Sequence, residues 1–478
     1  MNGLKIRLSA MNFLEFAVWG AYLVSLGMFL GSVGLGDKVL WFYTVQGLVS
    51  LFMPGVVGMI ADRYIPAQKM MSLCHTIAGA FMIAAGFYAM SCLNNGSAVE
   101  FAPLFTLYTV SVAFFMPTIG LNNSVAFSAM NQAGMDTVKE FPPIRIFGTI
   151  GFICAELFVN FVVVGHETVS VFDPEKQKYF EIVNDITIQQ TFWQMFVSGG
   201  ISILLAFYAL TMPKCPTNRS TKLSVSGMFG LSAFKLFKDK SMAVFFIFSM
   251  LLGVSLQITN GYGTMYIEQF GKVAQFLQVN PDFFADNPTF LISISQASET
   301  LCILLIPFCL RKFGIKGVML MAMIGWVLRF GFFGIGNTAP SGVWLLILSC
   351  IVYGVAFDFF NVSGGLYVDK KTSPEIRSSA QGLFMIMTNG IGASLGTFLA
   401  GTFVVNKKVL ADGLNPVQQL DGWRESWLIF AAYALVVAIL FWLIFRNPDK
   451  KTRRDKENEA EVREIASISD DPGGEIII

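Results

Sequence analysis

The sequence predicts an all-α polytopic membrane protein, with twelve transmembrane helices in two pseudo-symmetric six-helix halves. Of its 478 residues, 54% are hydrophobic and 14% are charged, which lies outside the range of ordinary soluble domains. Apolar runs of about 20 residues, the length that crosses a bilayer core, follow one another along the chain. Short motifs also recur at matching places in the two parts of the chain.

Twelve apolar windows, separated by Gly, Pro, Asn or charged clusters, define the expected spans. They cover residues 9–32, 38–61, 68–93, 101–127, 142–165, 191–212, 241–265, 288–310, 317–336, 342–367, 378–405 and 425–446. Residues 1–212 then form an N-terminal half and residues 241–446 a C-terminal half. No small-residue cleavage site follows the first span, so we expect that span to be retained.

The segments outside the spans are polar. Residues 213–240 form a connector in which the stretch GLSAFKLFKDK alternates apolar residues with Lys. This pattern is typical of a short interfacial amphipathic helix, and a plain solvated loop is the alternative. We expect residues 167–190 to form an external loop and residues 447–478 to form a disordered cytoplasmic tail.

Lys and Arg are unevenly distributed between the two sides of the predicted bundle. The connector, the tail and the loops after the second and eighth spans are rich in both, whereas the opposite side holds few. By the positive-inside rule both termini are cytoplasmic, which agrees with an even number of spans.

Two pairs of motifs indicate an internal repeat. GMIADRYIPAQK ends the second span and LRKFGIK ends the eighth, and each gives a short basic turn. PPIRIFG opens the fifth span and SPEIRSSAQG opens the eleventh. Two six-helix halves with weak internal symmetry are typical of transporters that rock around a central site.

Gly58, Ala61, Asp62 and Arg63, in the stretch GMIADR, resemble the signature that major facilitator superfamily transporters carry between their second and third helices. A finer resemblance, to the bacterial nucleoside:H+ symporter family of that superfamily, extends from the first to the twelfth span. It rests on the blocks NQAGMDTVKEFPPIRIFGTIGF, FFIFSMLLGVSLQITN, SISQASETL, GIKGVMLMAMIGWVLRF and IVYGVAFDFFNVSG.

In the fifth span, four side chains share one helical face because they are spaced 4, 3 and 4 residues apart. They are Arg145, Thr149, Phe152 and Glu156. Proline usually marks the first helical turn, so Arg145 is either a charge at the cytoplasmic end or, if the helix begins near Asp136, a residue well inside the span. The family resemblance favours the second version.

The seventh and eighth spans each carry a polar pair three residues apart, Gln257 with Asn260 and Gln296 with Glu299. Amides supply the paired donors and acceptors that can read a nucleobase edge or sugar hydroxyls. Hydrogen bonding between helices in lipid is the alternative. The glycines that follow Asn260 suggest a helix that bends or unwinds near the site.

Glu299, Arg329 and Asp358 are expected at similar depth, which is more charge than random insertion into a bilayer tolerates. One arrangement pairs Arg329 with one carboxylate and leaves the other to take a proton. Tyr353 and Phe357 share a helical face, and Asp358 points about 100° away from it. We therefore expect Asp358 behind these aromatics, although ordinary packing explains most aromatic residues in such a chain.

Two weaker signals lie in the N-terminal half. Glu15, with Asn12 and Trp19, gives the first span a polar face that is a candidate for lining a cavity. His75 in the third span is interpreted as structural, with a proton-relay role as the less favoured alternative.

The resemblance implies a substrate site between the halves, and we add Glu299, Asp358 and Arg329 as a charge network for proton coupling. The implied substrate-binding residues are Arg145, Thr149, Phe152, Gln257, Asn260, Gln296, Glu299, Tyr353 and Phe357. Glu156 matches no position that the family uses.

The expected function is proton-coupled nucleoside import by alternating access, in the bacterial cytoplasmic (inner) membrane. The expected partners are nucleoside, H+ and the lipid bilayer, with no nucleic acid, and the expected state is a functional monomer. With two His in the chain we expect no metal, and no cofactor beyond the proton gradient as driving force.

Three other functions remain open. A symporter for sugars or other small polar solutes is the first, because amides that read hydroxyls do not by themselves separate ribose from hexose. A membrane acyl or glycosyl transferase would need a nucleophile–base pair, and none is evident in the sequence. A nutrient-sensing receptor of transporter origin would bind without transporting.

Overall fold

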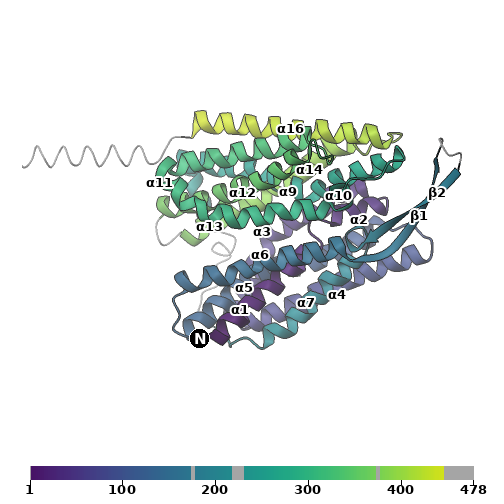
Figure 1. Cartoon of the computed structure of the whole chain (residues 1–478). Coiled ribbons are helices and arrows are strands. Elements are labelled where there is room, and N and C mark those ends of the chain that lie inside the picture. The colour runs from purple at the N-terminus through teal and green to yellow at the C-terminus, as the bar shows by residue number, and fades with distance from the viewer. Residues whose placement is uncertain (1, 174–177, 218–230, 373–376, 446–478) are drawn as a thin grey trace, which may run out of the picture.

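The computed structural model describes residues 2–173, 178–217, 231–372 and 377–445. Long helices form two groups, one drawn in purple to teal and the other in green to yellow (Figure 1). Within the described residues, ten helices are long and apolar enough to cross a membrane. The predicted tail, residues 447–478, lies outside the described residues.

The two groups correspond to consecutive parts of the chain. The first contains α1 (Asn2–Gly20), α2 (Leu26–Ser32), α3 (Val39–Arg63), α4 (Ala67–Asn94), α5 (Phe101–Gln132), α6 (Thr137–Phe161) and α7 (Trp193–Leu210). The second contains α9 (Lys240–Phe276), α10 (Phe283–Asp286), α11 (Pro288–Ile335), α12 (Val343–Lys371), α13 (Arg377–Met385), α14 (Ala393–Leu399), α15 (Asn406–Lys408) and α16 (Pro416–Ile444). We call them the N-half and the C-half.

Two departures from regular helix reconcile ten long helices with twelve crossings. The first span is interrupted between α1 and α2, and neither part alone is both long and apolar enough to count as a crossing helix. Conversely, α11 contains both the eighth and the ninth predicted spans, which are separated at Gly314, where φ is 67° and ψ is 176°. The chain is therefore a multi-pass membrane protein with the predicted all-α fold.

The break in the first span is stabilised by side chains from other helices. Tyr43 of α3 donates to the carbonyl of Leu23, and Thr264 of α9 donates to the carbonyl of Val24 at 2.5 Å. A backbone carbonyl without a partner at membrane depth would cost several kcal/mol. The sequence around residues 21–25 is apolar and gives no warning of the break.

Other sequence expectations need correction. The helix α9 is unbroken past Asn260, whereas the eleventh span contains two π-helical segments, Ile386–Gly392 and Ala400–Val405. Residues 167–190, expected to be a loop, lie largely in an antiparallel hairpin of β1 (Val163–Asp173) and β2 (Lys178–Thr187).

The twelfth span begins earlier than predicted. It starts at Pro416, where the Asn415 side chain accepts from the Gln418 amide and the Gln418 side chain bonds back to the Asn415 amide. This reciprocal capping satisfies backbone donors at the helix start. The apolar run sets in later than the cap, which is why hydrophobicity alone misplaces the start.

The connector between the halves contains a 3-10 helix, Leu231–Lys238. Its Phe237 ring lies 5.4 Å from the ring of Phe246 in α9, so one apolar side chain of this segment packs on the C-half. Residues 218–230 of the connector lie outside the described residues.

The two halves meet from the middle of the bundle to the end that carries the β-hairpin (Figure 1). Asn160 of α6 donates to Asn287 at 2.8 Å and accepts from the Phe290 amide. Ser394 of α14 donates to the carbonyl of Thr44 in α3. We call this closed end, opposite the N-terminus, the hairpin end.

A glycine allows α2 and α9 to touch at the hairpin end. A Cβ atom at Gly27 would lie 2.5 Å from the backbone oxygen of Gly261, whereas a Cβ at Gly200 of α7 would meet nothing within 4 Å. Changing Gly27→Ala should therefore weaken closure by about 1–3 kcal/mol, whereas Gly200→Ala should not.

The measurement is the yield of a disulfide between cysteines placed at Thr44 and Ser394, in a chain whose seven native cysteines are replaced. We expect the yield to fall with Gly27→Ala and to stay unchanged with Gly200→Ala. Equal yields in both variants would contradict the close approach.

Candidate functional site

Arg145 lies well inside the fifth span. The helix α6 begins at Thr137 and continues through both prolines, so Arg145 is placed more than two turns from its start. The guanidinium carbon stands 3.9 Å from the centre of the Phe16 ring on α1, a cation–π distance. Of the two sequence interpretations, the structure therefore supports the inner position.

The charges around Arg145 come from both halves. The carboxylates of Glu299, Glu15 and Asp358 each attract its guanidinium group. Glu299 lies on α11 and Asp358 on α12, so the C-half supplies two of the three. Because opposite charges interact more strongly when water is excluded, Arg145 links the N-half electrostatically to the C-half.

The two amide side chains of the seventh span form a hydrogen-bonded chain with a third amide side chain, from α3. Asn260 donates to Gln257 at 2.8 Å, and Gln257 donates to Gln46 of α3 at 3.3 Å. The predicted shared face of Gln257 and Asn260 is confirmed. Sequence reasoning did not select Gln46, although a glutamine inside an apolar span is a signal that could have found it.

Several buried polar atoms of the predicted site residues and of Gln46 have no hydrogen-bond partner among the described residues. They include Nε2 of Gln46, Oε1 of Gln296 and Oδ2 of Asp358. A buried polar group left unpaired costs about 1–3 kcal/mol. Donors and acceptors of this kind are therefore available to water or to a polar solute.

Aromatic rings form one side of the region. Tyr353 and Phe357 of α12 stack with their planes 3° apart and their centres 5.7 Å apart. The Tyr353 ring also meets the edge of Trp326. Phe357, Trp326 and Asn361 line a small cavity of about 20 Å³ between α9 and α12. The predicted shared face of Tyr353 and Phe357 is confirmed.

Asp358 is buried, with 5% of its surface exposed, whereas Glu299 is half-buried. The two carboxylates repel each other, and Arg145 attracts both. Asp358 is also within electrostatic range of Cys302 of α11 and of Tyr353.

The expected pairing of Arg329 with a carboxylate is wrong for this conformation. Its guanidinium group donates to Ser295 and to the backbone oxygen of Ser349, and it stacks 4.5 Å from the centre of the Tyr353 ring. A hydroxyl, a carbonyl and a π-face thus solvate this buried cation in place of a carboxylate.

The remaining predicted residues lie on the N-half side. Phe152 is buried with its ring edge-on to Trp19 at 6.3 Å, and Thr149 is half-buried one turn nearer Arg145. Phe16 and Trp19, both on α1, complete this wall. The sequence placed Trp19 on a candidate cavity-lining face with Glu15, whereas Phe16 was not selected. Among 47 Phe, nothing local distinguishes Phe16.

Glu15 does not line an open cavity, which corrects the sequence expectation. It is fully buried and bonded on both oxygens, to Thr118 at 2.6 Å and to His75 at 2.9 Å. The other ring nitrogen of His75 meets Ser202 at 3.0 Å. This fully satisfied network ties four helices of the N-half together.

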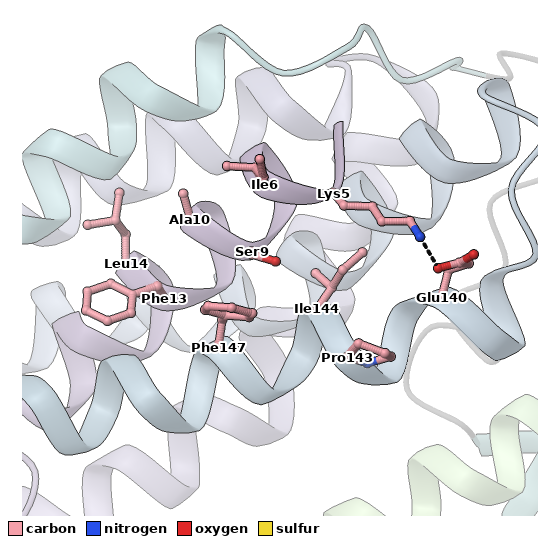
Figure 2. Close-up of a pocket in the computed structure, with 10 residues that line it drawn as sticks. All are labelled: Lys5, Ile6, Ser9, Ala10, Phe13, Leu14, Glu140, Pro143, Ile144 and Phe147. Atoms are coloured by element: carbon pink, nitrogen blue, oxygen red, sulfur yellow. Dashed lines mark ion pairs between the residues drawn. The ribbon is translucent and has the colours of Figure 1, made fainter. Parts of the chain in front are cut away.

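A separate pocket of about 780 Å³ lies between α1 and α6 near the N-terminus (Figure 2). Its lining is mostly apolar, and its charged groups, Lys5 and Glu140, already pair with each other at 2.5 Å. It contains none of the predicted site residues. The central region, with its unpaired polar atoms, is therefore the better candidate for a polar solute.

Comparison with known proteins agrees with this geometry. The chain matches the family model described as nucleoside H+ symporter over residues 1–450. It is 39% identical over 457 residues to the xanthosine permease of Escherichia coli (strain K12), covering 94% of this chain and 99% of that protein. It is 38% identical over 446 residues to nucleoside permease NupG of the same organism, covering 93% and 96%.

Solved structures show the same fold. The crystal structure of the nucleoside transporter NupG superposes with a TM-score of 0.78 at 37% identity, covering 93% of this chain and 100% of that one. A bacterial homologue of the lysosomal transporter Spinster superposes with a TM-score of 0.64 at 14% identity, which shows the fold alone. The chain has the major facilitator fold and belongs to the nucleoside H+ symporter family.

Proposed function

We propose that this chain imports nucleosides together with protons, by alternating access around one central site between its halves. The observation that supports this most directly is that Arg145 of the N-half lies within electrostatic range of Glu299 and Asp358 of the C-half. A site built from both halves is accessible from one side at a time when the halves rock.

The chemistry of the lining suits a nucleoside. The stacked rings of Tyr353 and Phe357 offer a flat apolar surface, and stacking a base on an aromatic ring is worth about 1–3 kcal/mol. The amides of Gln257, Asn260 and Gln296 would bond to base edges and ribose hydroxyls. A flat aromatic surface favours a solute with a base over a plain sugar.

The N-half would contact the substrate through Arg145, Thr149 and Phe152. Glu299 joins them from the C-half and forms the proposed proton-coupling pair with Asp358. Arg329, which is bonded to Ser295 and to the Ser349 carbonyl, is left out of this pair. The relatives named as xanthosine and nucleoside permeases support this substrate class.

We further propose that both termini are cytoplasmic and that the protein resides in the bacterial inner membrane. The hairpin end then faces the periplasm, and the closed contacts there shut the site from outside. The division into residues 1–212, 213–240 and 241–446 remains our proposed domain organisation. Because one chain supplies both sides of the site, we propose a functional monomer.

Proton coupling follows from a charge imbalance. Two carboxylates of the C-half face the single guanidinium of Arg145, so one proton would balance the second negative charge. We assign that proton to the pair formed by Glu299 and Asp358. Protonation would make it less costly to close the halves around the loaded site, because burying uncompensated charge is expensive.

The test of this function is uptake of radiolabelled uridine into vesicles with an imposed pH gradient. One pH unit is worth about 1.4 kcal/mol per proton, so coupling of one proton should allow about tenfold accumulation. An uncoupler should abolish it, and unlabelled sugars should not compete. Uptake that ignores the gradient would contradict proton coupling, and competition by hexoses would favour the sugar symporter.

Neutralising the carboxylates should separate binding from coupling. In Glu299→Gln and Asp358→Asn, at least one variant should lose gradient-driven accumulation and keep uridine exchange at equal pH, because an amide keeps the shape without titrating. Glu140→Gln, which removes only a surface ion pair with Lys5, is the matched control and should accumulate uridine normally. Full accumulation in both site variants would refute the assignment.

A further inference from the structure

Glu156 is a buried carboxylate that the proposed coupling does not use. It lies on α6 in the stripe of Arg145 and Phe152, one turn beyond Phe152 toward the hairpin end. Its exposed fraction is 0%, and neither carboxylate oxygen has a hydrogen-bond partner among the described residues. The side chain is completely buried by protein, so its lack of hydrogen-bond partners is not due to contact with lipid.

The surroundings place Glu156 in the contact between the halves. One turn further along α6, Asn160 bonds to Asn287 and to the Phe290 amide of the C-half. From α12, Cys350 and Tyr353 lie within electrostatic range of the Glu156 carboxylate. The contact that buries Glu156 is therefore the closed hairpin end itself.

The groups around Glu156 do not neutralise it. On α1, Glu15 is bonded to His75 and Thr118, and α5 contributes only Tyr108 as a titratable side chain. On α11, Arg329 is bonded to Ser295 and to the Ser349 carbonyl. The other titratable side chains of α11 and α12 near this contact are Glu299, Cys350, Tyr353 and Asp358. No ion pair to Glu156 occurs among the described residues.

An ionised carboxylate in this position would be very costly. The effective penalty for removing an ion from water inside a protein is several kcal/mol, whereas a neutral carboxyl group that lacks partners costs less. Closing the hairpin end around Glu156 is thus favoured when the side chain carries a proton, and opening that end to water removes the requirement.

We propose that Glu156 is a proton-binding site linked to closure of the hairpin end. As the halves approach, one carboxylate oxygen takes a proton from a hydronium ion in the water at that end, so that an O–H bond of the hydronium breaks and one to the carboxylate forms. As they separate, the proton returns to water there. This inference rests on the alternating access of the proposed function, but it concerns a site distinct from Glu299 and Asp358.

Linkage fixes the sign of the pH dependence. Where Glu156 is ionised in the open form and protonated in the closed form, the closed-to-open ratio falls up to tenfold for each unit of rising pH. The site therefore favours the conformation closed to the hairpin side in acid. It acts on the equilibrium between conformations even when no nucleoside is bound.

The test is a distance measurement on the full-length chain without nucleoside. Spin labels at Lys38 and Lys407 flank the contact in which Asn406 donates to the carbonyl of Asp37, on a background with the seven native cysteines replaced. The population with the short distance is followed against pH. We expect it to fall as pH rises in the parent protein.

In Glu156→Gln and Glu156→Leu, which remain neutral, the component of the pH response due to this site should vanish and the closed form should persist at high pH. Glu140→Gln, on the same helix but in the surface pair with Lys5, is the matched control and should keep the parent response. A parent response retained in both Glu156 variants, or absent in the parent itself, would overturn the proposal.

Uridine uptake by the same proteins separates the two proposals. If the parent protein does not accumulate uridine, the proposed function fails, whatever the spin labels report. If it does, and the Glu156 variants keep the parent pH response in the distance measurement, only the inference about Glu156 fails.

Discussion

Holding a charged group away from water is costly in a membrane-spanning bundle, and this cost governs how the polar side chains are arranged. The buried charged side chains reduce this cost in different ways. Glu15 is satisfied inside the N-half by His75. Arg329 is solvated inside the C-half by hydroxyl, carbonyl and ring. The group around Arg145 and Glu299 draws its charges from both halves. The charge balance there is therefore sensitive to the relative position of the halves, which suits it to coupling.

Backbone polar groups are also costly to hold away from water without a partner. This cost links the break in the first span to the closed conformation. The first span breaks at residues 21–25, and the freed carbonyl of Val24 accepts a hydrogen bond from Thr264 of the opposite half. When the hairpin end opens, that carbonyl must bond to water instead, as the polar groups of Asn160 must. Hydrogen bonds across the interface are thus exchanged for bonds to water, which keeps the net difference between conformations small.

Local spacing in the sequence predicts much of the fold and part of the site. The spans follow from apolar length, and the shared face of Gln257 and Asn260 follows from helical geometry. What the sequence does not reveal are partnerships between distant segments. The bond from Gln257 to Gln46 depends on how the halves dock, and so does the lack of any partner for Glu156. The expected carboxylate partner of Arg329 was wrong because depth in the membrane does not specify direction around a helix.

In the proposed function, Arg145 and Glu299 act together, across the two halves, in binding nucleoside. A double-mutant cycle measures this directly, with calorimetric uridine binding to the parent protein, Arg145→Gln, Glu299→Gln and the double variant at one fixed pH. Residues in one charge network show coupling free energies of about 0.5–3 kcal/mol, and we expect a value in that range, with the double variant little worse than the poorer single one. Effects that simply add, to within about 0.5 kcal/mol, would show that Arg145 and Glu299 act independently.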